Sequence, residues 1–458
     1  MRRILLLIVV VALVVAGGAW FQAGRAAGPV VEIRQPGAFV GQATALELAV
    51  EAEGGQFSRV DVTLEQGDAS YPVFTLNQPA EAEIRQEAAD RLFIMRPIGA
   101  EAVPELVEGQ ARIVVRAARP VLFGLREAET VATHDVTVRL EPPRVAVLST
   151  LHYVNHGGSE FVVYRATPSD VESGVRVGDV AYPGFPASGA GIPGDDSLRI
   201  AFFALLHDQD LNTPIELYAR DPAGNDASSP ITHRAFARDF ARSNITIPDS
   251  FLTQVVPLIV ANTPGLEADI ASADPLDAFL YVNGPLRQRN NATIATYAEQ
   301  TAPEMLWSDT FQALGNASVE ARFADYRTYL MGGEEVDQQV HLGFDLAVTA
   351  QVPITAAHRG RVVHAGYLGI YGNCVIVDHG LGVQSLYAHL SSIDAAVGDV
   401  VEKGQTVGRS GQTGLAGGDH LHFTMLVGGQ QVNPIEWWDP QWMQDRVLRK
   451  IADAGGTP

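Results

Sequence analysis

The feature that most restricts the fold of this chain is the recurrence of glycine through its last third. Between residues 331 and 442, short apolar runs of strand length alternate with glycine-containing turns. The glycines of this stretch are Gly360, Gly366, Gly369, Gly372, Gly380, Gly382, Gly398, Gly404, Gly408, Gly411 and Gly414. Because turns at this spacing interrupt any long helix, the pattern predicts a compact domain of short antiparallel strands.

Two further β-rich segments precede this domain. Val60, Val62 and Leu64 alternate with polar residues, which is the pattern of a strand buried on one face. Glycine-rich turns interrupt the alternation within the first segment, and the Pro142–Pro143 pair marks its end. In the second, residues 161–164 and similar runs look like strands. We therefore expect two β-sandwich-like modules, the second one immunoglobulin-like.

The segment between the second β module and the C-terminal domain has a helical pattern. Pro248 and Asp249 suit a first helical turn, and apolar residues follow with helical clustering. The fold class is thus mainly β with a helical connector. The predicted division is 1–27, a signal or anchor segment; 28–142, the first β module; 143–240, the second; 241–330, the connector; 331–445, the C-terminal domain; and 446–458, a tail.

The N-terminus indicates export. Arg2 and Arg3 precede an uninterrupted apolar stretch from Ile4 to about Phe21. This stretch is long enough to span a bilayer, and basic residues before it favour a cytoplasmic N-terminus. Small residues around Ala23–Ala27 also offer a signal-peptidase site. We favour an anchor in the cytoplasmic membrane with the bulk of the chain in the periplasm or otherwise outside the cytoplasm; a cleaved signal and a secreted protein stay open.

Length and composition limit the function classes. A chain of 458 residues with 47% apolar residues can bury two to four domain cores. Its formal net charge of −21 argues against nucleic acid as a partner, because phosphate binding requires lysine and arginine. The single cysteine, Cys374, cannot form an intramolecular disulfide and lies in an apolar run typical of a buried strand.

Histidines and one carboxylate recur with the spacing of a metal site. His341 and Asp345 are four residues apart, and His420 and His422 are two apart. Residues i and i+2 of a strand point to the same face, so both imidazoles of the second pair can address one cleft. His389 supplies another imidazole from a predicted strand. Neutral imidazole and carboxylate are ligands that zinc accepts.

The region from His341 to Asp439 resembles the M23 family of LytM/lysostaphin-like zinc metallopeptidases. The matching stretches are His341–Asp345, Ala357–Val363, Gly369–Asn373, Val377–Gly380, Tyr387–Leu390, Gly398–Gln405, Gly411–Gly414, His420–Phe423 and Val432–Pro434. The resemblance implies that His341, Asp345 and His422 bind Zn²⁺ and that His389 and His420 are the two catalytic histidines. The reaction that the resemblance implies requires no serine or cysteine nucleophile. Thr424 and residues 416–419 depart from the common family pattern.

The resemblance implies a zinc endopeptidase that cleaves peptide bonds of bacterial peptidoglycan, and we expect the stem-peptide cross-links as its substrate. Two alternatives remain: a regulator of the LytM type that activates a separate cell-wall amidase, and a wall-binding scaffold. The expected partners are peptidoglycan peptides and, through the N-terminal segment, the inner membrane. Nucleic acid is not expected, and protein partners in the cell wall stay unspecified.

Overall fold

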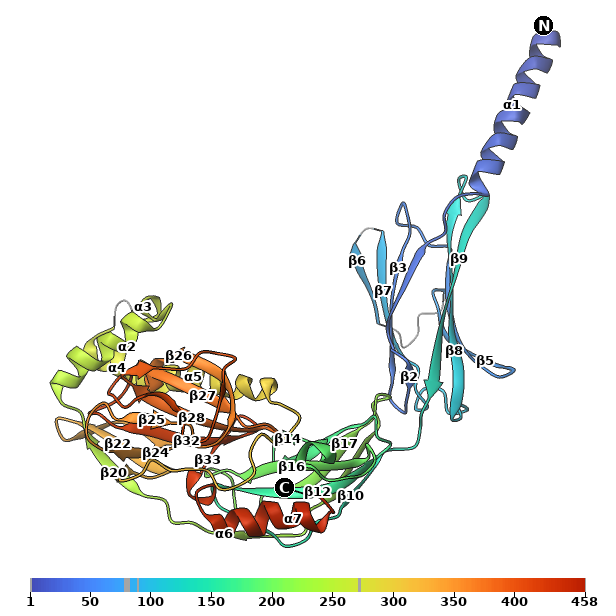
Figure 1. The fold of residues 1–458 in the computed structure, drawn as a ribbon. Helices are drawn as coiled ribbons and strands as arrows, with labels where there is room; N and C mark the ends of the chain where they lie inside the picture. Colours follow the sequence, from blue (N-terminus) through green and yellow to red (C-terminus); the bar gives the residue numbers. More distant parts are fainter. Residues whose placement is uncertain (1, 78–82, 89, 271–272, 458) are drawn as a thin grey trace. The chain divides into compact units, whose positions relative to one another are not determined.

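The protein is described here from a computed structural model, which covers residues 2–77, 83–88, 90–270 and 273–457. The fold is mainly β, as predicted (Figure 1). The chain forms two compact units. One comprises residues 1–143 and 220–226, and the other comprises residues 144–219 and 227–458.

The first unit begins with a long apolar helix, α1 (Arg2–Ala23). Its most apolar window has a mean hydropathy of 2.9, and none of that window is buried against the rest of the described chain. At 1.5 Å per residue, 22 residues extend about 33 Å, enough to cross the hydrocarbon core of a bilayer. The expected apolar segment is therefore a helix of spanning length and composition.

The remainder of the first unit is a β sandwich, because two sheets share one apolar core. The alternating residues Val60, Val62 and Leu64 are almost fully buried in this core, together with Leu46 and Leu48 of the other sheet. One sheet has the order β1-β3-β7-β6 and the other β2-β9-β8-β4-β5. The strands are β1 (Val30–Gln35), β2 (Phe39–Val40), β3 (Ala45–Glu51), β4 (Arg59–Gln66), β5 (Ala69–Thr75), β6 (Glu83–Ala88), β7 (Arg91–Pro97), β8 (Gly109–Val121) and β9 (Arg126–Val138).

The second β-rich segment opens the other unit. Its two four-stranded sheets have the orders β10-β12-β16-β15 and β14-β13-β17-β18, and β11 pairs with β19. The predicted strand at residues 161–164 lies within β12. The strands are β10 (Arg144–Val147), β11 (His152–Asn155), β12 (Gly158–Thr167), β13 (Glu172–Val177), β14 (Val180–Pro183), β15 (Phe185–Pro186), β16 (Leu198–Leu205), β17 (Ile215–Arg220), β18 (Asp226–Pro230) and β19 (His233–Phe236).

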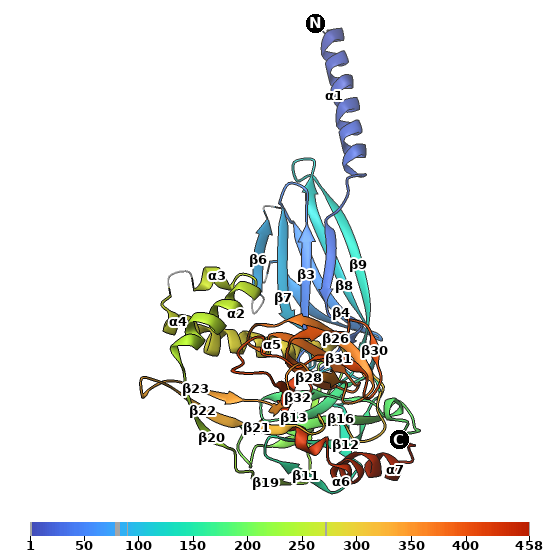
Figure 2. The ribbon, with the colours of Figure 1, turned by 60° about the vertical axis from the view of Figure 1, so that its left-hand side comes forward.

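The predicted connector contains helices between two strands. The helical elements are η2 (Phe251–Val255), α2 (Val256–Asn262), α3 (Leu266–Asp269), α4 (Pro275–Tyr281), η3 (Val282–Leu286), α5 (Arg287–Thr296) and η4 (Tyr297–Gln300). Asp274 caps α4 by accepting a hydrogen bond from the backbone of Asp277, and Pro275 occupies the first helical position. Before the helices, β20 (Arg242–Thr246) pairs with β22 (Asp325–Met331), which pairs with β23 (Glu334–His341) (Figure 2).

The C-terminal domain is built on an antiparallel sheet of order β21-β24-β32-β28-β27-β26-β30, with β33 paired to β32. A smaller sheet has the order β25-β31-β29. The strands are β21 (Ser318–Ala321), β24 (Phe344–Ala347), β25 (Pro353–Thr355), β26 (Gly360–Tyr367), β27 (Asn373–Asp378), β28 (Val383–Leu390), β29 (Ser392–Ile393), β30 (Val400–Val401), β31 (Thr406–Arg409), β32 (Leu421–Val427) and β33 (Gln430–Val432). The β27–β28 turn needs glycine, because Gly380 has φ of 86° and a Cβ there would lie 1.8 Å from the carbonyl oxygen of Glu304.

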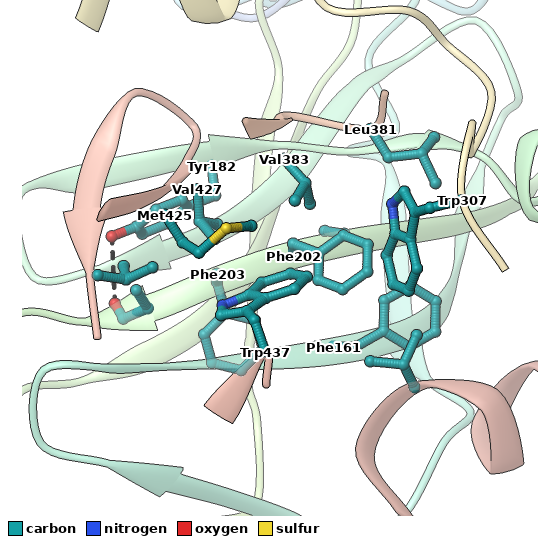
Figure 3. Packing of buried hydrophobic residues seen from close by; sticks show 14 of the residues in the cluster. Phe161, Tyr182, Phe202, Phe203, Trp307, Leu381, Val383, Met425, Val427 and Trp437 are labelled. Atoms are coloured by element: carbon teal, nitrogen blue, oxygen red, sulfur yellow. Dashed lines mark hydrogen bonds between the residues drawn. The ribbon is translucent and has the colours of Figure 1, made fainter. Parts of the chain in front are cut away.

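One apolar core joins the second β-rich segment to the C-terminal domain. The ring of Phe202 in β16 lies tilted against two others, with its centroid 4.7 Å from that of Phe161 and 5.7 Å from that of Trp437 (Figure 3). Trp307, from the segment between helices and sheet, lies 5.9 Å from Trp437. The C-terminal residues, expected to form a tail, include the helix α7 (Arg449–Asp453), whose Ile451 is buried in the same core. That the segments divided at residues 240 and 330 fold independently therefore stays a prediction.

Candidate metal site

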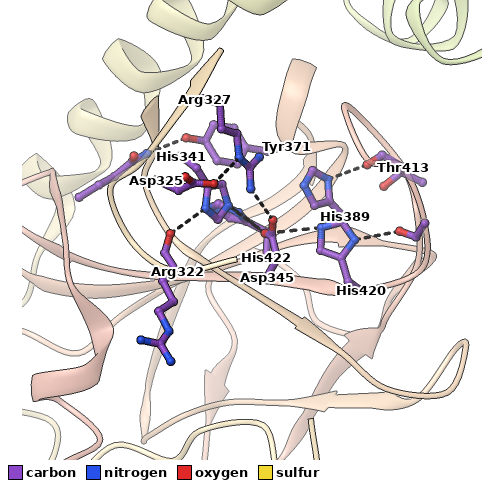
Figure 4. A network of polar contacts seen from close by, with 12 residues as sticks. Arg322, Asp325, Arg327, His341, Asp345, Tyr371, His389, Thr413, His420 and His422 are labelled. Atoms are coloured by element: carbon purple, nitrogen blue, oxygen red, sulfur yellow. Dashed lines mark hydrogen bonds and ion pairs between the residues drawn. The ribbon is translucent and has the colours of Figure 1, made fainter. Parts of the chain in front are cut away.

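Three of the predicted site residues meet at one point in the second unit. His341 ends β23, Asp345 lies in β24 and His422 lies in β32. The Nε2 atom of His341 lies 2.9 Å from Oδ1 of Asp345 and 2.9 Å from Nδ1 of His422. The third side of this triangle, from His422 Nδ1 to Asp345 Oδ1, measures 3.1 Å. All three side chains are buried. Figure 4 shows them pointing toward one another.

Strand pairing brings these residues together. In the antiparallel pair β24–β32, Asp345 lies opposite His422, and in β28–β32, Ala388 lies opposite His422. Directly paired residues of neighbouring strands have side chains on the same face. Gly343 makes room for the ring of His422, since a Cβ at that position would lie 2.5 Å from its Cε1 and Nε2 atoms. The packing of the His422 ring thus explains the glycine in the His-Leu-Gly-Phe-Asp stretch.

The hydrogen bond of His341 fixes which of its nitrogens faces the cluster. Its Nδ1 lies 3.2 Å from the carbonyl oxygen of Arg322, which can only accept. Nδ1 therefore carries the hydrogen, and the Nε2 lone pair points toward Asp345 Oδ1, another electron-pair donor. The electron pairs of these two atoms repel each other, and a cation between them would remove that repulsion. The Nε2 atom of His422 is buried with no hydrogen-bond partner among the described residues, so the polar groups of the cluster are incompletely satisfied as it stands.

Arg327 of β22 holds the carboxylate of Asp345 in place by hydrogen bonding. Its guanidinium donates to Oδ2 of Asp345 at 3.1 Å and to Oδ2 of the buried Asp325 at 3.2 Å. Burial alone would raise the pKa of Asp345, but the neighbouring side chains of His341, His420 and His422 hold that pKa well below its usual value. Asp345 therefore stays ionised with Oδ1 directed at the histidines.

His389 and His420 stand beside the cluster and present their Nε2 atoms. The Nδ1 of His389 donates to the carbonyl of Thr413, and the Nδ1 of His420 to that of Gly418, each at 2.8 Å. The two rings lie 4.9 Å apart between centroids, and His420 Nε2 is 3.5 Å from Asp345 Oδ1. His389 has φ of 60°, a left-handed conformation that is uncommon outside glycine and asparagine.

The environment shifts the histidine pKa values in different directions. Burial, aided by His420 and His422, lowers the pKa of His389 well below its usual value. Burial lowers the pKa of His422 to about 4. Burial also acts to lower the pKa of His420, but its hydrogen bond to Asp345 and the charge of Asp345 outweigh that effect and raise it. Neutral imidazole next to a stabilised carboxylate is the donor set that zinc and similar borderline-soft cations accept.

A cavity of about 320 Å³ opens onto these residues. The five predicted site residues line one part of it. The helical connector and its flanking strand line another part, where Pro248, Phe251 and Phe279 give an apolar wall. Arg287 and Asn291 of α5 add polar groups to the same wall. The connector therefore contributes to the candidate site as well as linking domains.

Sequence reasoning missed Arg327 and Arg287, which lie outside the region that resembles M23 peptidases. Arg327 alternates with Asp325 along a polar strand, a pattern that carries no sign of a nearby metal site. Tyr371 lines the cavity and lies within a quoted stretch, Gly369–Asn373, but received no role. The other histidines of the domain lie elsewhere: His358 pairs with Asp309, His364 with Tyr297, and His379 with Ser385.

Comparison with known proteins finds matches to the region that contains the candidate site. Residues 339–434 match peptidase family M23. The DD-carboxypeptidase/endopeptidase Mpg of Neisseria meningitidis serogroup B is 40% identical over 97 residues, which are 21% of this chain and 22% of that protein. The peptidoglycan DD-endopeptidase ShyA of Vibrio cholerae is 36% identical over 96 residues, 21% of this chain and 22% of that protein.

Other matches broaden the picture. The murein hydrolase activator EnvC of Escherichia coli is 34% identical over 106 residues, 23% of this chain and 25% of that protein. A crystal structure of a peptidase M23 from Pseudomonas aeruginosa is 18% identical with a TM-score of 0.36, and the match covers 59% of this chain and 88% of that one. The chain spans about a fifth to a quarter of the length of the curated relatives it matches. The chain therefore carries a peptidase M23 domain at its C-terminal end, over residues 339–434.

Proposed function

We propose that this protein is a zinc metalloendopeptidase that hydrolyses peptide bonds in bacterial peptidoglycan. The observation that supports it most is the convergence of His341 Nε2, Asp345 Oδ1 and His422 Nδ1. Two further imidazoles, of His389 and His420, line the same cavity. In this proposal His341, Asp345 and His422 hold the metal, and His389 and His420 perform proton transfer.

When bound, zinc would supply a Lewis acid for the scissile carbonyl group. The chain supplies the other parts. His389 and His420 each use Nδ1 to donate to a backbone carbonyl, so each offers Nε2 to a substrate or a water molecule in the cavity. One of the two accepts a proton from the attacking water, and the other stabilises the oxyanion or protonates the leaving amine.

Supporting groups keep the site ordered. Arg327 orients Asp345 through its bond to Oδ2, leaving Oδ1 for the metal. The carbonyls of Arg322, Thr413 and Gly418 set the imidazole tautomers. Such partners of ligands and catalytic groups commonly contribute 10- to 100-fold, as an order of magnitude, to metal affinity or activity.

The proposed substrate is the stem-peptide cross-link. Two relatives support this choice, one named as a DD-carboxypeptidase/endopeptidase and the other as a peptidoglycan DD-endopeptidase. The cavity wall adds an argument from charge, because Arg287 lies there with its Nε and one terminal nitrogen bonded to Asn283. Among the residues that the structure describes, Arg287 forms no ion pair with a carboxylate. We propose that Arg287 binds a free carboxylate of the stem peptide.

A second candidate function is regulation of another hydrolase, since the chain also matches the activator EnvC. A regulator requires a docking surface for its partner, whereas the present site places five histidine and aspartate side chains around a cavity that can hold a substrate. The enzyme is therefore the preferred function. Stimulation of a purified amidase by a protein that releases nothing by itself would favour the activator.

The proposed location is the cell envelope, with α1 in the cytoplasmic membrane and the remaining chain outside the cytoplasm. The support is the length and apolar composition of α1 together with Arg2 and Arg3 at its start. A secreted form follows if the segment is cleaved.

The experiment is release of muropeptides from purified peptidoglycan by the full chain in detergent. Zinc-loaded protein should release fragments with new peptide ends, chelation should stop the release, and added zinc should restore it. The His364→Ala variant is the matched control, because His364 lies in the same domain and outside the cavity. Release that persists after complete removal of the metal would contradict the proposal.

A further inference from the structure

The loop between β8 and β9 is apolar and points into solvent. It consists of Leu122, Phe123, Gly124 and Leu125, and the side chain of Phe123 is fully exposed. Loops of this kind are usually built from glycine, asparagine, aspartate and serine. Leu122 and Phe123 have φ of 52° and 59°, a region that apolar residues rarely adopt. The loop therefore combines an unfavourable composition with an unfavourable backbone.

This loop lies beside the C-terminal end of α1, within the same compact unit (Figure 1). Arg126, the first residue of β9, donates to the carbonyl of Trp20 at 3.0 Å, and its guanidinium lies 4.8 Å from the centre of the Trp20 ring. Arg119 of β8 donates to the carbonyl of Ala27 at 2.8 Å. These contacts hold the loop level with the last turns of the helix.

The end of α1 has the composition of a membrane boundary. Trp20 and Phe21 lie in its last turns, and the guanidinium of Arg25 lies 4.4 Å from the centre of the Phe21 ring. Aromatic and basic residues gather where hydrocarbon meets water. The loop, held at that level by Arg126, thus reaches the depth at which lipid headgroups begin.

We propose that Leu122, Phe123 and Leu125 insert into the interface of the lipid bilayer next to α1. The occupant of this apolar surface is lipid, because the surface continues that of a helix whose own apolar side chains are exposed throughout. A second contact with the membrane would orient the long strands β8 and β9 relative to it, which a single membrane-spanning helix does not do by itself. This proposal rests on the proposed location of α1 in the membrane and is independent of the peptidase function.

The test measures depth with a fluorophore on a cysteine. The native Cys374 is fully buried, and burial raises the pKa of its thiol, so it resists labelling. Phe123→Cys carries the label at the loop. Asp68→Cys carries it in the β4–β5 turn, at the far end of the same sheet, because Arg59 pairs with Ala118 and Glu65 with Arg112. The full chain is reconstituted in vesicles of phosphatidylethanolamine and phosphatidylglycerol that contain nitroxide-bearing lipid.

The expected result is quenching at residue 123 about three-fold or more stronger than at residue 68 in protein recovered with the vesicles. Equal quenching at the two positions overturns the proposal. A second variant separates insertion from mere proximity to α1. Leu125→Asp added to Phe123→Cys should reduce the quenching, because a charge disfavours insertion while α1 is unchanged. Quenching that is unaffected by Leu125→Asp would also overturn the proposal.

Discussion

Asp345 and His422 face each other across the antiparallel strands β24 and β32, and their Oδ1 and Nδ1 atoms lie 3.1 Å apart. Neither side chain needs a loop to reach the other, so the pair is positioned by sheet register. His341 joins them from the end of β23. If these three residues hold the metal, removing one ligand should empty the site without unfolding the sheet.

The first prediction concerns His422→Ala. The bound zinc should fall from about one per chain to a small fraction, because a site with two protein ligands loses most of its affinity. Metal analysis of the purified protein measures this, and circular dichroism checks the fold. Unchanged zinc content in His422→Ala, with His364→Ala as the matched control, would show that the metal binds elsewhere.

Gly343 offers a test of packing at the site. A Cβ there would lie 2.5 Å from the His422 ring and 2.9 Å from the carbonyl oxygen of Phe423. Gly343→Ala should displace the ring and lower zinc affinity by about ten-fold or more, measured by competition with a chelator. Gly366→Ala is the control, since the nearest atom to its Cβ would be 3.8 Å away. Equal affinities for the two variants would refute the packing role.

Arg287 tests the substrate proposal. Loss of one charge-assisted hydrogen bond in Arg287→Gln should lower kcat/KM on cross-linked stem peptides by roughly 10- to 100-fold. Amidation of the recognised substrate carboxylate should remove the difference between wild type and variant. Arg289→Gln is the control, because Arg289 is exposed and pairs with Asp269 outside the cavity. An equal effect of both substitutions would point to general charge and not to recognition.

Glu436 predicts a pH dependence of stability. Burial raises its pKa to about 7, although it accepts hydrogen bonds from Asn155 and the backbone of Ser159. Its carboxyl is therefore protonated more readily in the folded state than in the unfolded chain. The contribution of the protonated Glu436 side chain to the free energy of unfolding is therefore complete below about pH 4.5. It is lost as the pH rises through 7.

The variant Glu436→Gln should thus be more stable than wild type at pH 8, by about 3 kcal/mol as an order of magnitude, and the difference should vanish near pH 4.5. The neutral amide can keep both hydrogen bonds if the side-chain amide of Asn155 rotates. Nearby charged groups are Glu160, which raises the pKa of Glu436, and Arg238, which lowers it. Thermal unfolding followed by tryptophan fluorescence measures the effect, with the exposed Glu402→Gln as control. A difference that does not change with pH would contradict the burial argument.

The sequence predicted those parts of the site that depend on local spacing. His420 and His422 share a strand face by period, and His341 and Asp345 are close along the chain, so their clustering follows from short-range geometry. The buried alternation of Val60, Val62 and Leu64 was also confirmed. The roles of the five site residues stay predictions.

The sequence could not predict what lies opposite these residues. Phe251 and Arg287 belong to helices whose packing on the M23 domain depends on contacts between residues far apart in sequence, and no local pattern reports them. The same holds for Phe202 and Trp437, which join the second β-rich segment to that domain. Alternation and helical periodicity show that a face is buried, but not what it is buried against.

If metal binding and proton transfer belong to different histidines, the full-length His389→Asn variant should lose one and keep the other. Asparagine tolerates the left-handed backbone at this position better than alanine, so the fold should survive. We predict about one zinc per chain, as in wild type, together with loss of muropeptide release from peptidoglycan. Undiminished release by His389→Asn with its zinc intact would contradict a role for His389 in proton transfer.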